Sequence, residues 1–336
     1  MEFVSKFIKM KSAIVTGGCG FVGRHLVRRL LDLGWQVKVV DPVVKQTGGI
    51  SPETGWPFFD PRDYSNFSYE KIDCREFFRE NPKAQFDYIF HLAAIVGGRL
   101  MIENNPLSVA TDLAIDADMW NWVSNSNTGK VINFSSSAAY PVSLQQSTSS
   151  VVKLKENLIK LDGNLGIPDL TYGWSKLTSE YLGKIAWSRY GIKSVVYRPF
   201  SGYGSDQDLS YPFPSICKRA IDSRNENEFL VWGSGLQSRD FIHIDDCIEG
   251  ILKTMDKIND GDALNLSTGI STSFIDFAKI ATEIVGYYPK ILGDTNKPVG
   301  VMSRIGDTDK QIEFGFKPKI SFSDGVSEGI NYWVGK

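Results

Sequence analysis

The chain has few of the features that mark secreted, metal-binding and membrane-spanning proteins. Its 336 residues include only four cysteines, scattered without a C-x-x-C pair: Cys19, Cys74, Cys217 and Cys247. That spacing argues against a zinc site or a disulfide framework and favours the reducing cytoplasm. No apolar run approaches the roughly 18 residues that cross a bilayer, and the N-terminus lacks the apolar stretch of a secretion signal. Residues 1–9, before Met10, are interpreted as an upstream extension.

An excess of positive charge is missing as well. The 37 lysines and arginines are balanced by 39 acidic residues, for a net charge of -2, so no basic field draws the protein onto nucleic acid. Hydrophobic residues make up 42% of the chain and charged residues 23%, which is ordinary for a globular protein with a substantial core. The length suits about two domains of roughly 150 residues each.

What the first half of the chain does contain is a regular alternation. Five short runs are apolar on both faces, as strands of a covered parallel sheet must be: 12–16, 36–40, 88–92, 131–134 and 194–197. Helical patterns lie between them, near 21–33, 75–80, 106–124 and 172–190. The alternation predicts a Rossmann-like α/β fold with a doubly wound parallel sheet.

Three stretches interrupt this alternation: Pro42–Tyr69, Pro141–Leu170 and the part beyond residue 198. The second of them has a helical pattern near Val151–Leu161. We interpret the later stretches as walls of a substrate pocket, because long loops in a compact domain are usually functional. The predicted division is a cofactor domain over 10–198, segments near 241–268 that return to it, and a smaller substrate-binding lobe over 199–336.

A glycine-rich motif follows the first predicted strand: residues 16–23 read TGGCGFVG and open a helix. This is the context of the dinucleotide-binding fingerprint. Gly17 permits the tight turn, Gly20 lets the backbone approach a pyrophosphate, and Gly23 lets the helix pack closely on the strand. The helix N-terminus, starting at Phe21 and Val22, offers free N–H groups to the phosphates.

Two acidic residues lie where the adenosine half of a dinucleotide is expected. Asp41 ends the second strand, 18 residues after Gly23, and is placed to accept hydrogen bonds from the ribose hydroxyls. Its charge would repel a 2′-phosphate, so NAD is favoured over NADP; a turn before Pro42 is the alternative role. Asp73 either meets the adenine edge or caps the helix that follows it.

Several motifs stand in a shared order: TGGCGFVG at 16–23, HLAA at 91–94, FSSSAAYP at 134–141, YGWSK at 172–176, RPFSGYG at 198–204 and RDFIHIDD at 239–246. Together they resemble the extended short-chain dehydrogenase/reductases, specifically the nucleotide-sugar epimerases and dehydratases. The similarity covers nearly the whole chain after Met10. It implies an NAD-dependent enzyme, a UDP- or GDP-linked sugar as substrate, and a homodimer. It also implies that Cys74, Leu92, Ala93 and Ala94 contact the cofactor.

The catalytic candidates are a tyrosine, a lysine and a serine. Tyr172 and Lys176 are four residues apart on a predicted helix and therefore face the same way. The lysine ammonium would favour the tyrosine phenolate, which could take a proton from a sugar hydroxyl while hydride leaves for NAD. Lys176 would also fit the nicotinamide ribose. By resemblance, the catalytic serine lies four residues before Tyr140, which is Ser136; it would hydrogen-bond the reacting oxygen. Ser135 is interpreted as structural.

The positions after Ser136 bear on the reaction. Related dehydratases and 3,5-epimerases carry acids or a cysteine there, but this chain has Ser137 and Ala138. Because alanine transfers no proton, chemistry beyond hydride transfer at one carbon is disfavoured. Residues 96–99, Val-Gly-Gly-Arg, resemble a loop of GDP-fucose synthase and GDP-mannose 3,5-epimerase, and Gly97 would approach the sugar ring closely.

Other positions bear on substrate binding and assembly. Arg239 and Arg304 resemble diphosphate-binding arginines, and a guanidinium suits phosphate. Ser201 stands where relatives have an asparagine, and Asp112 aligns with the usual active-site asparagine of the fourth helix. The bulky residues of that helix are either core or dimer interface: Met119, Trp120 and Trp122.

The favoured function is a nucleotide-sugar C4 epimerase that works through a 4-keto intermediate. The alternative is a 4-dehydrogenase or 4-keto reductase that exchanges NAD with solution. A 4,6-dehydratase or a 3,5-epimerase is less favoured. A non-catalytic NAD-binding scaffold is the remaining hypothesis, and the presence of Tyr172, Lys176 and Ser136 argues against it.

Overall fold

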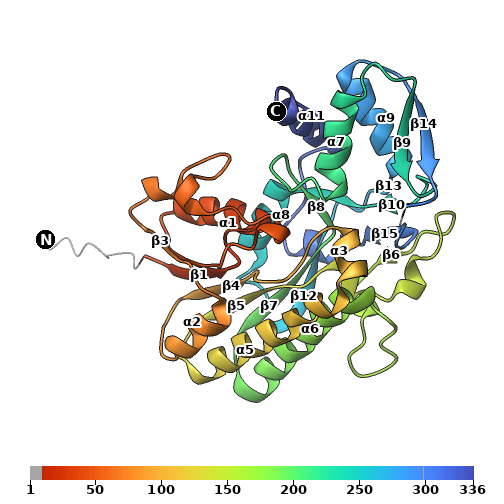
Figure 1. Ribbon diagram of the computed structural model, residues 1–336. Coiled ribbons are helices and arrows are strands. Elements are labelled where there is room, and N and C mark those ends of the chain that lie inside the picture. Colours follow the sequence, from red (N-terminus) through yellow and green to blue (C-terminus); the bar gives the residue numbers. More distant parts are fainter. Residues whose placement is uncertain (1–9, 298) are drawn as a thin grey trace, which may run out of the picture.

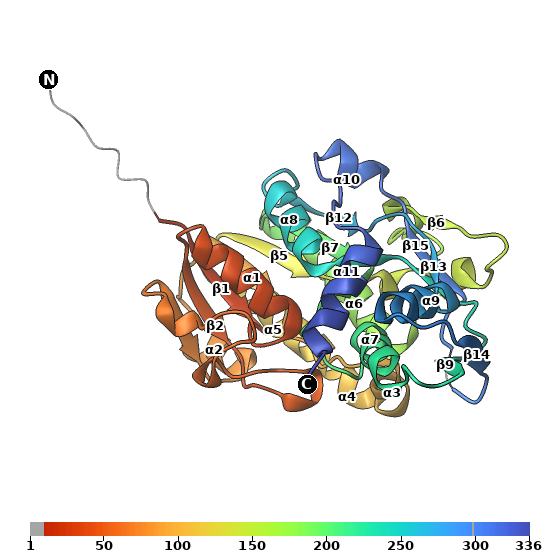
Figure 2. The same ribbon diagram turned by 90° about the horizontal axis from the view of Figure 1, so that it is seen from above.

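The computed structural model describes residues 10–297 and 299–336; the predicted upstream extension, residues 1–9, lies outside them. A seven-stranded sheet forms the larger part of the molecule (Figures 1 and 2). All its strands are parallel, in the order β3 (Phe67–Glu70), β2 (Gln36–Val40), β1 (Ser12–Thr16), β4 (Tyr88–His91), β5 (Lys130–Phe134), β7 (Ser194–Pro199) and β12 (Asp260–Leu266). The predicted doubly wound Rossmann-like fold is confirmed.

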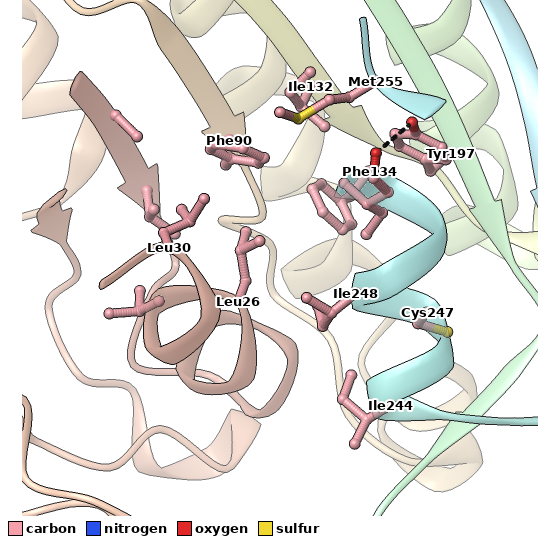
Figure 3. Packing of buried hydrophobic residues seen from close by; sticks show 14 of the residues in the cluster. Leu26, Leu30, Phe90, Ile132, Phe134, Tyr197, Ile244, Cys247, Ile248 and Met255 are labelled. Atoms are coloured by element: carbon pink, nitrogen blue, oxygen red, sulfur yellow. Dashed lines mark hydrogen bonds between the residues drawn. The ribbon is translucent and has the colours of Figure 1, made fainter. Parts of the chain in front are cut away.

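Both faces of this sheet are covered, which explains the apolar strands. Ala13 and Val15 of β1 pack on one face with helices α1 (Phe21–Asp32) and α8 (Ile244–Thr254). Figure 3 shows Leu26 and Leu30 of α1 and Ile248 of α8 in this core. Ile14, between them, belongs to the core of the other face. There the covering helices are α2 (Cys74–Glu80), α5 (Thr111–Asn125) and α6 (Leu170–Tyr190). Alternate side chains of a strand point to opposite faces, so both must be apolar.

The strand order reverses between β1 and β4. From β1 the chain continues outward to β2 and β3, then returns to place β4 on the other side of β1. The loops that leave these two strands therefore diverge, and they leave a crevice at the carboxyl edge of the sheet. Ligands of open α/β sheets bind at such a point.

The second part of the molecule lies beyond this edge. Its core is formed by α7 (Pro212–Asp222), α9 (Phe274–Val285) and α11 (Phe322–Trp333) with strands β9 (Glu228–Trp232) and β14 (Lys290–Asp294). Beside it runs a small sheet of β13 (Thr272–Ser273), β10 (Ser238–Arg239), β15 (Ser303–Gly306) and β6 (Lys153–Leu154). Strands β8 (Ser201–Tyr203) and β11 (Phe241–His243) form a separate pair, and α10 (Asp309–Glu313) follows β15.

The path of the chain between the two parts is interwoven. Strand β12 joins the large sheet and α8 packs against α1, so residues near 241–268 contribute to the cofactor-side body. Conversely, β6 comes from within 10–198 but pairs with β15 of the small sheet. None of the helices in residues 10–297 and 299–336 combines the length and apolar character needed to span a bilayer.

Two predicted helices differ in the structure. No helix forms near Val151–Leu161; the segment holds β6 and a short 3-10 turn, because β6 finds a partner strand some 150 residues later. The helix predicted over 106–124 is two helices, α4 (Pro106–Val109) and α5, with Ala110 between them. A further short helix, α3 (Arg99–Asn104), precedes them.

Candidate active site

One cavity of about 860 Å³ opens at the carboxyl edge of the large sheet. It runs from the glycine-rich turn to the small sheet. The residues assigned from the sequence to cofactor or substrate line this cavity, apart from Lys176: Gly17, Gly20, Phe21, Val22, Gly23, Asp41, Asp73, Cys74, Leu92, Ala93, Ala94, Gly97, Ser136, Ser137, Tyr172, Ser201, Arg239 and Arg304. The structure thus brings together segments that are far apart in the chain.

The glycine-rich turn has no room for side chains. Gly17 has a left-handed backbone with φ of 73°, and a Cβ there would lie 2.7 Å from the Ala93 nitrogen. A Cβ at Gly23 would lie 2.5 Å from the Gly17 carbonyl oxygen. Gly20 occupies the N-cap position of α1, and no side chain accepts a hydrogen bond from the first turn of this helix. The first N–H groups of the helix are therefore available to an anion. This end of the cavity suits a pyrophosphate.

Asp41 holds the turn in place. Its buried carboxylate accepts hydrogen bonds from the N–H groups of Cys19 (2.9 Å) and Val43 (2.7 Å). Burial raises the pKa of Asp41, and the two N–H groups only partly offset that effect. Asp41 also lines the cavity, so its position is compatible with the predicted ribose contact, which stays a prediction.

Asp73 caps helix α2. Its carboxylate accepts the N–H of Arg75 at 2.9 Å and pairs with the Arg75 guanidinium at 2.7 Å. The arginine lowers the pKa of Asp73. The capping role considered from the sequence is therefore present, and the adenine contact stays a prediction.

The catalytic candidates come from two elements. Ser136 ends the loop after β5, and its hydroxyl accepts the Ala138 N–H at 3.1 Å. Tyr172 lies in the first turn of α6 and faces the same cavity. Lys176 lies one turn further along, buried behind the tyrosine, with its Nζ 5.8 Å from the centre of the Tyr172 ring. Ser135 instead donates a hydrogen bond to Glu180, which fits a structural role.

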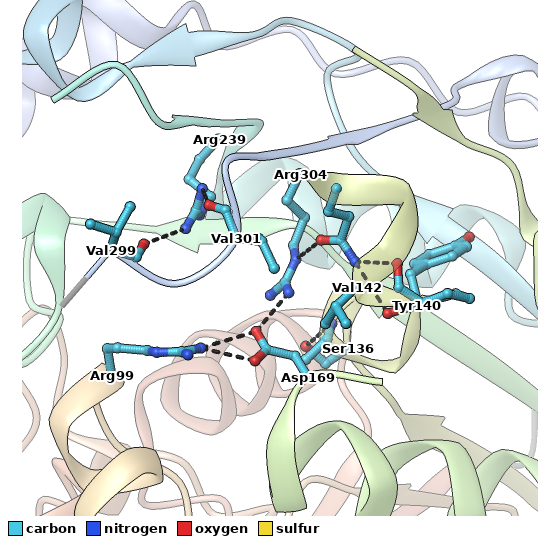
Figure 4. A network of polar contacts seen from close by, with 12 residues as sticks. Arg99, Ser136, Tyr140, Val142, Asp169, Arg239, Val299, Val301 and Arg304 are labelled. Atoms are coloured by element: carbon cyan, nitrogen blue, oxygen red, sulfur yellow. Dashed lines mark hydrogen bonds and ion pairs between the residues drawn. The ribbon is translucent and has the colours of Figure 1, made fainter. Parts of the chain in front are cut away.

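The other end of the cavity carries arginines (Figure 4). Arg239 is half-buried, and its guanidinium donates to the carbonyls of Ser238 (2.8 Å) and Val301 (2.9 Å). Among the described residues, no carboxylate forms an ion pair with Arg239. Burial, reinforced by neighbouring Arg304, lowers the pKa of Arg239 to about 9. A half-buried guanidinium that faces the cavity without a carboxylate partner is suited to bind an anion.

Two residues of this end were missed from the sequence. Asp169 accepts from Arg304 Nη2 at 2.7 Å and from Arg99 Nη1 at 2.9 Å (Figure 4). Burial works against its charge, but the two arginines lower the pKa of Asp169. Its place directly before α6, the helix that carries Tyr172 in its first turn, was the available signal. Arg99 was noted only as the neighbour of the 96–98 loop.

Two loops, 44–49 and 206–211, line the cavity and contact each other. Residues 44–49, after β2, meet the loop at 206–211: a Cβ at Gly48 would lie 3.2 Å from Asp208 Cβ. The buried Arg24 guanidinium joins three segments, donating to the carbonyls of Cys19 (2.9 Å) and Gly48 (3.2 Å) and pairing with Asp206 (2.8 Å). Val43, directly before segment 44–49, has a left-handed φ of 60°, which costs on the order of 1–3 kcal/mol for such a residue.

Known proteins match this chain along most of its length. The family model described as "NAD dependent epimerase/dehydratase family" matches residues 13–267, more than half of the chain. The chain belongs to this family. It is therefore an NAD-dependent enzyme of the epimerase/dehydratase type, and the glycine turn, the uncapped helix N-terminus and the cavity fit the dinucleotide.

Individual relatives of the family are distant in sequence. The chain is 25% identical to Putative GDP-L-fucose synthase 2 of Arabidopsis thaliana, covering 98% of this chain and 94% of the relative. It is 24% identical to a putative UDP-glucose 4-epimerase of Methanocaldococcus jannaschii, covering 95% and 97%. A crystal structure of UDP-glucuronic acid 4-epimerase from Bacillus cereus superposes with a TM-score of 0.80 at 24% identity, covering 96% and 99%. At that identity the structural likeness shows the fold alone.

Proposed function

We propose that this enzyme is a C4 epimerase of a UDP- or GDP-linked sugar, working through a 4-keto intermediate with retained NAD. The observation that carries the proposal is that Tyr172 and Ser136 share one cavity with the glycine turn and with the arginines of the small sheet. The cavity thus provides places for a dinucleotide, a reacting hydroxyl and a diphosphate in one continuous space. The relatives named for GDP- and UDP-linked sugars support this substrate class.

The chain's own residues divide the work as follows. Tyr172 removes the proton of the sugar hydroxyl, and Ser136 donates a hydrogen bond to the same oxygen. Lys176, buried behind the ring, stabilises the phenolate by its charge. When bound, NAD would supply the hydride acceptor, held by the glycine turn and the N-terminus of α1. Arg239 and Arg304 hold the diphosphate while the keto sugar turns and presents its other face.

Acid–base groups for a second reaction are poorly placed. Ala138 follows Ser137 where elimination would need an acid. Asp169 lines the cavity and lies three residues before Tyr172 in the sequence. Two arginines lower the pKa of Asp169 and keep its carboxylate ionised. Cys247 also lines the cavity, but burial raises its pKa far above the ordinary value. These observations favour hydride transfer at one carbon over dehydration or 3,5-epimerisation.

The contacts between segment 44–49 and loop 206–211 favour retained NAD over exchangeable NAD. Segment 44–49 closes over the cofactor end against loop 206–211, with Arg24 tying both to the glycine turn. These contacts would hinder the release of a dinucleotide bound at this end of the cavity. Retention is what an epimerase needs, because the same NAD molecule must give back the hydride it took.

The proposal includes a homodimer. Met119, Trp120 and Trp122 are buried within the chain and so belong to its core. Helices α5 and α6 still expose apolar side chains to solvent, at Leu113, Trp174 and Tyr181. Large exposed apolar groups on a packed helix pair are typical of an interface. Sedimentation analysis tests this, and a monomer at micromolar concentration would contradict it.

The function is tested with purified enzyme and no added NAD. UDP-glucose, UDP-galactose and GDP-linked sugars are incubated separately, and products are identified by NMR. We expect one pair of C4 epimers to interconvert. Stoichiometric NADH formation without an epimer would instead establish a 4-dehydrogenase.

Tyr172→Phe is expected to lower kcat by about 1,000-fold, within the range of general acid–base catalysis. Tyr190→Phe, at an exposed tyrosine of the same helix that is not among the proposed interface residues, is the matched control and keeps full activity. If Tyr172→Phe retained wild-type kcat, the assignment of the catalytic base would be wrong.

A further inference from the structure

A buried ion pair contacts the chain on both sides of the segment that carries Ser136. Glu180 comes from α6, eight residues after Tyr172, and Arg198 comes from β7. Each of the two is 3% exposed. Arg198 Nε donates to Glu180 Oε1 at 2.9 Å, and Arg198 Nη2 donates to Glu180 Oε2 at 2.6 Å, so the contact is bidentate. Neither residue has a role in the steps above.

Stability alone gives little reason for such a pair. Taking two charges out of water is costly, and a buried ion pair can often be replaced by apolar residues without loss of stability. The other hydrogen bonds of Glu180 and Arg198 show which parts of the chain the pair holds in place.

The pair holds both ends of segment 136–139. Ser135, the residue before this segment, donates a hydrogen bond from its hydroxyl to Glu180 Oε1. Tyr140, the residue after it, accepts a hydrogen bond from Arg198 Nη1 at 3.1 Å, and the guanidinium lies 4.9 Å from the centre of the Tyr140 ring. Both flanking side chains are buried. One ion pair therefore fixes the residues on both sides of the segment.

The segment is also held against the helix that carries Tyr172. The Ser136 hydroxyl accepts the Ala138 N–H at 3.1 Å. The Ala138 carbonyl accepts the N–H of Asp169, directly before α6, at 2.9 Å. A Cβ on Gly173 of α6 would lie 2.5 Å from the same carbonyl oxygen, so the packing is tight. The distance between the Ser136 and Tyr172 hydroxyls thus depends on the contacts that fix this segment on α6.

We propose that Glu180 is a positioning residue that, through Ser135, holds Ser136 where its hydroxyl and that of Tyr172 reach the same substrate oxygen. The inference rests on the proposed function, because it takes Ser136 and Tyr172 as catalytic residues. The Ser135 N–H also donates to the Tyr197 carbonyl at 2.9 Å, so strand pairing survives the loss of the side-chain contact. What is lost is the link from the strand end to α6. A misplacement of about 1 Å can cost up to about 100-fold in rate.

The test begins with Ser135→Ala, which breaks the contact to Glu180 and leaves the ion pair intact. On the substrate identified above, kcat is expected to fall by about 10-fold, with KM unchanged because the arginines of the small sheet keep their places. Ser179→Ala is the matched control. Ser179 is also a buried serine that joins α6 to β5, through the Asn133 side chain at 3.1 Å. Its loss leaves segment 136–139 in place, so kcat stays at the wild-type value.

A double-mutant cycle separates positioning from a general loss of structure. If Ser135 acts through Ser136, then Ser135→Ala lowers kcat no further when it is combined with Ser136→Ala. A general loosening of the fold would lower kcat again in that background. Tyr140→Phe, which releases the other end of the segment, is expected to lower kcat without raising KM as well.

Glu180→Gln leaves the buried Arg198 without a carboxylate, and the loss of one partner of a buried pair is strongly destabilising. Ser135→Ala, in which the pair survives, is therefore the deciding variant.

Wild-type kcat in Ser135→Ala would overturn the proposal, and so would an equal fall in Ser179→Ala or an additive double mutant. The two proposals fail separately. Wild-type kcat in Tyr172→Phe overturns the proposed function. Wild-type kcat in Ser135→Ala, in an enzyme that depends on Tyr172 and Ser136, overturns only the positioning role of Glu180.

Discussion

The two ends of the cavity are built on different principles. At the proposed cofactor end, the backbone is expected to do the binding: Gly17 and Gly23 leave no space for a Cβ, and the N-terminus of α1 offers its N–H groups. At the proposed substrate end, side chains are expected to bind: Arg99 and Arg304 pair with Asp169, and Arg239 lies beside them, bonded to the Val301 carbonyl (Figure 4). The first end is encoded in eight consecutive residues, 16–23. The second is assembled from segments far apart in the chain, so the two ends are expected to respond differently to mutation.

The largest effect is expected at the cofactor end. In Gly23→Ala the new Cβ would lie 2.5 Å from the Gly17 carbonyl oxygen, so the turn and the helix must separate. Overpacking of this kind costs roughly 1–3 kcal/mol, and we expect the Kd for NAD to rise by about 100-fold, measured by titration of the refolded apoenzyme. Gly163→Ala is the control, because nothing lies within 4 Å of its Cβ. Equal NAD affinity in Gly23→Ala and Gly163→Ala would show that the tight packing of Gly23 is not needed for NAD binding.

The next effect concerns the substrate end alone. Arg239→Leu removes charged hydrogen bonds to the diphosphate, worth roughly 1.5–3 kcal/mol, so UDP or GDP binding is expected to weaken by about 10–100-fold in calorimetry. NAD content should not change. Because burial disfavours the Arg239 charge and lowers its pKa to about 9, the Tm of the variant is expected to equal or exceed that of the wild type. Arg79→Leu, at an exposed position, serves as control. A Tm well below wild type would mean that Arg239 is structural.

The smallest effect is expected where the two ends are joined. His25 of α1 contacts Asp206 at 2.8 Å, next to Arg24. Burial lowers the pKa of His25, but hydrogen bonds and charges from Asp206 and Asp245 outweigh it and leave the pKa raised. Its stabilisation is therefore complete below the ordinary histidine value and is lost as pH rises through the folded value.

Urea unfolding at pH about 6 and about 9 measures this loss, which we expect to be up to roughly 1 kcal/mol. The same measurement is made on His25→Gln, in which the pH dependence of the unfolding free energy that comes from His25 is expected to disappear. Since the pKa of Asp206 is lowered, its own contribution is lost only in acid and does not interfere. An identical pH dependence in wild type and variant would show that the His25–Asp206 contact does not stabilise the junction.

Local sequence patterns predicted the helices and strands correctly where these elements depend on residues close to one another in the chain. The strand at 12–16 and the helix that starts at Phe21 lie as expected, because alternation and glycine spacing are local properties. Strand β3 (Phe67–Glu70) was hidden in the long segment after β2, since its residues are only partly buried at the sheet edge. The pattern near Val151–Leu161 predicted a helix because the partner strand, β15, lies far away in sequence.

The same division applies to the site. The residues from 16 to 23, Tyr172 with Lys176, and Ser136 could be named from the sequence, because each motif is short and its geometry follows from one turn or one helix. Asp169 between Arg99 and Arg304, and the contact between Asp116 and His91, could not. Those contacts join separate elements, and their existence depends on how the elements pack. The amino-acid order alone therefore specifies the glycine turn and the proposed catalytic pair, whereas the charged groups around that pair are brought together only when the chain has folded.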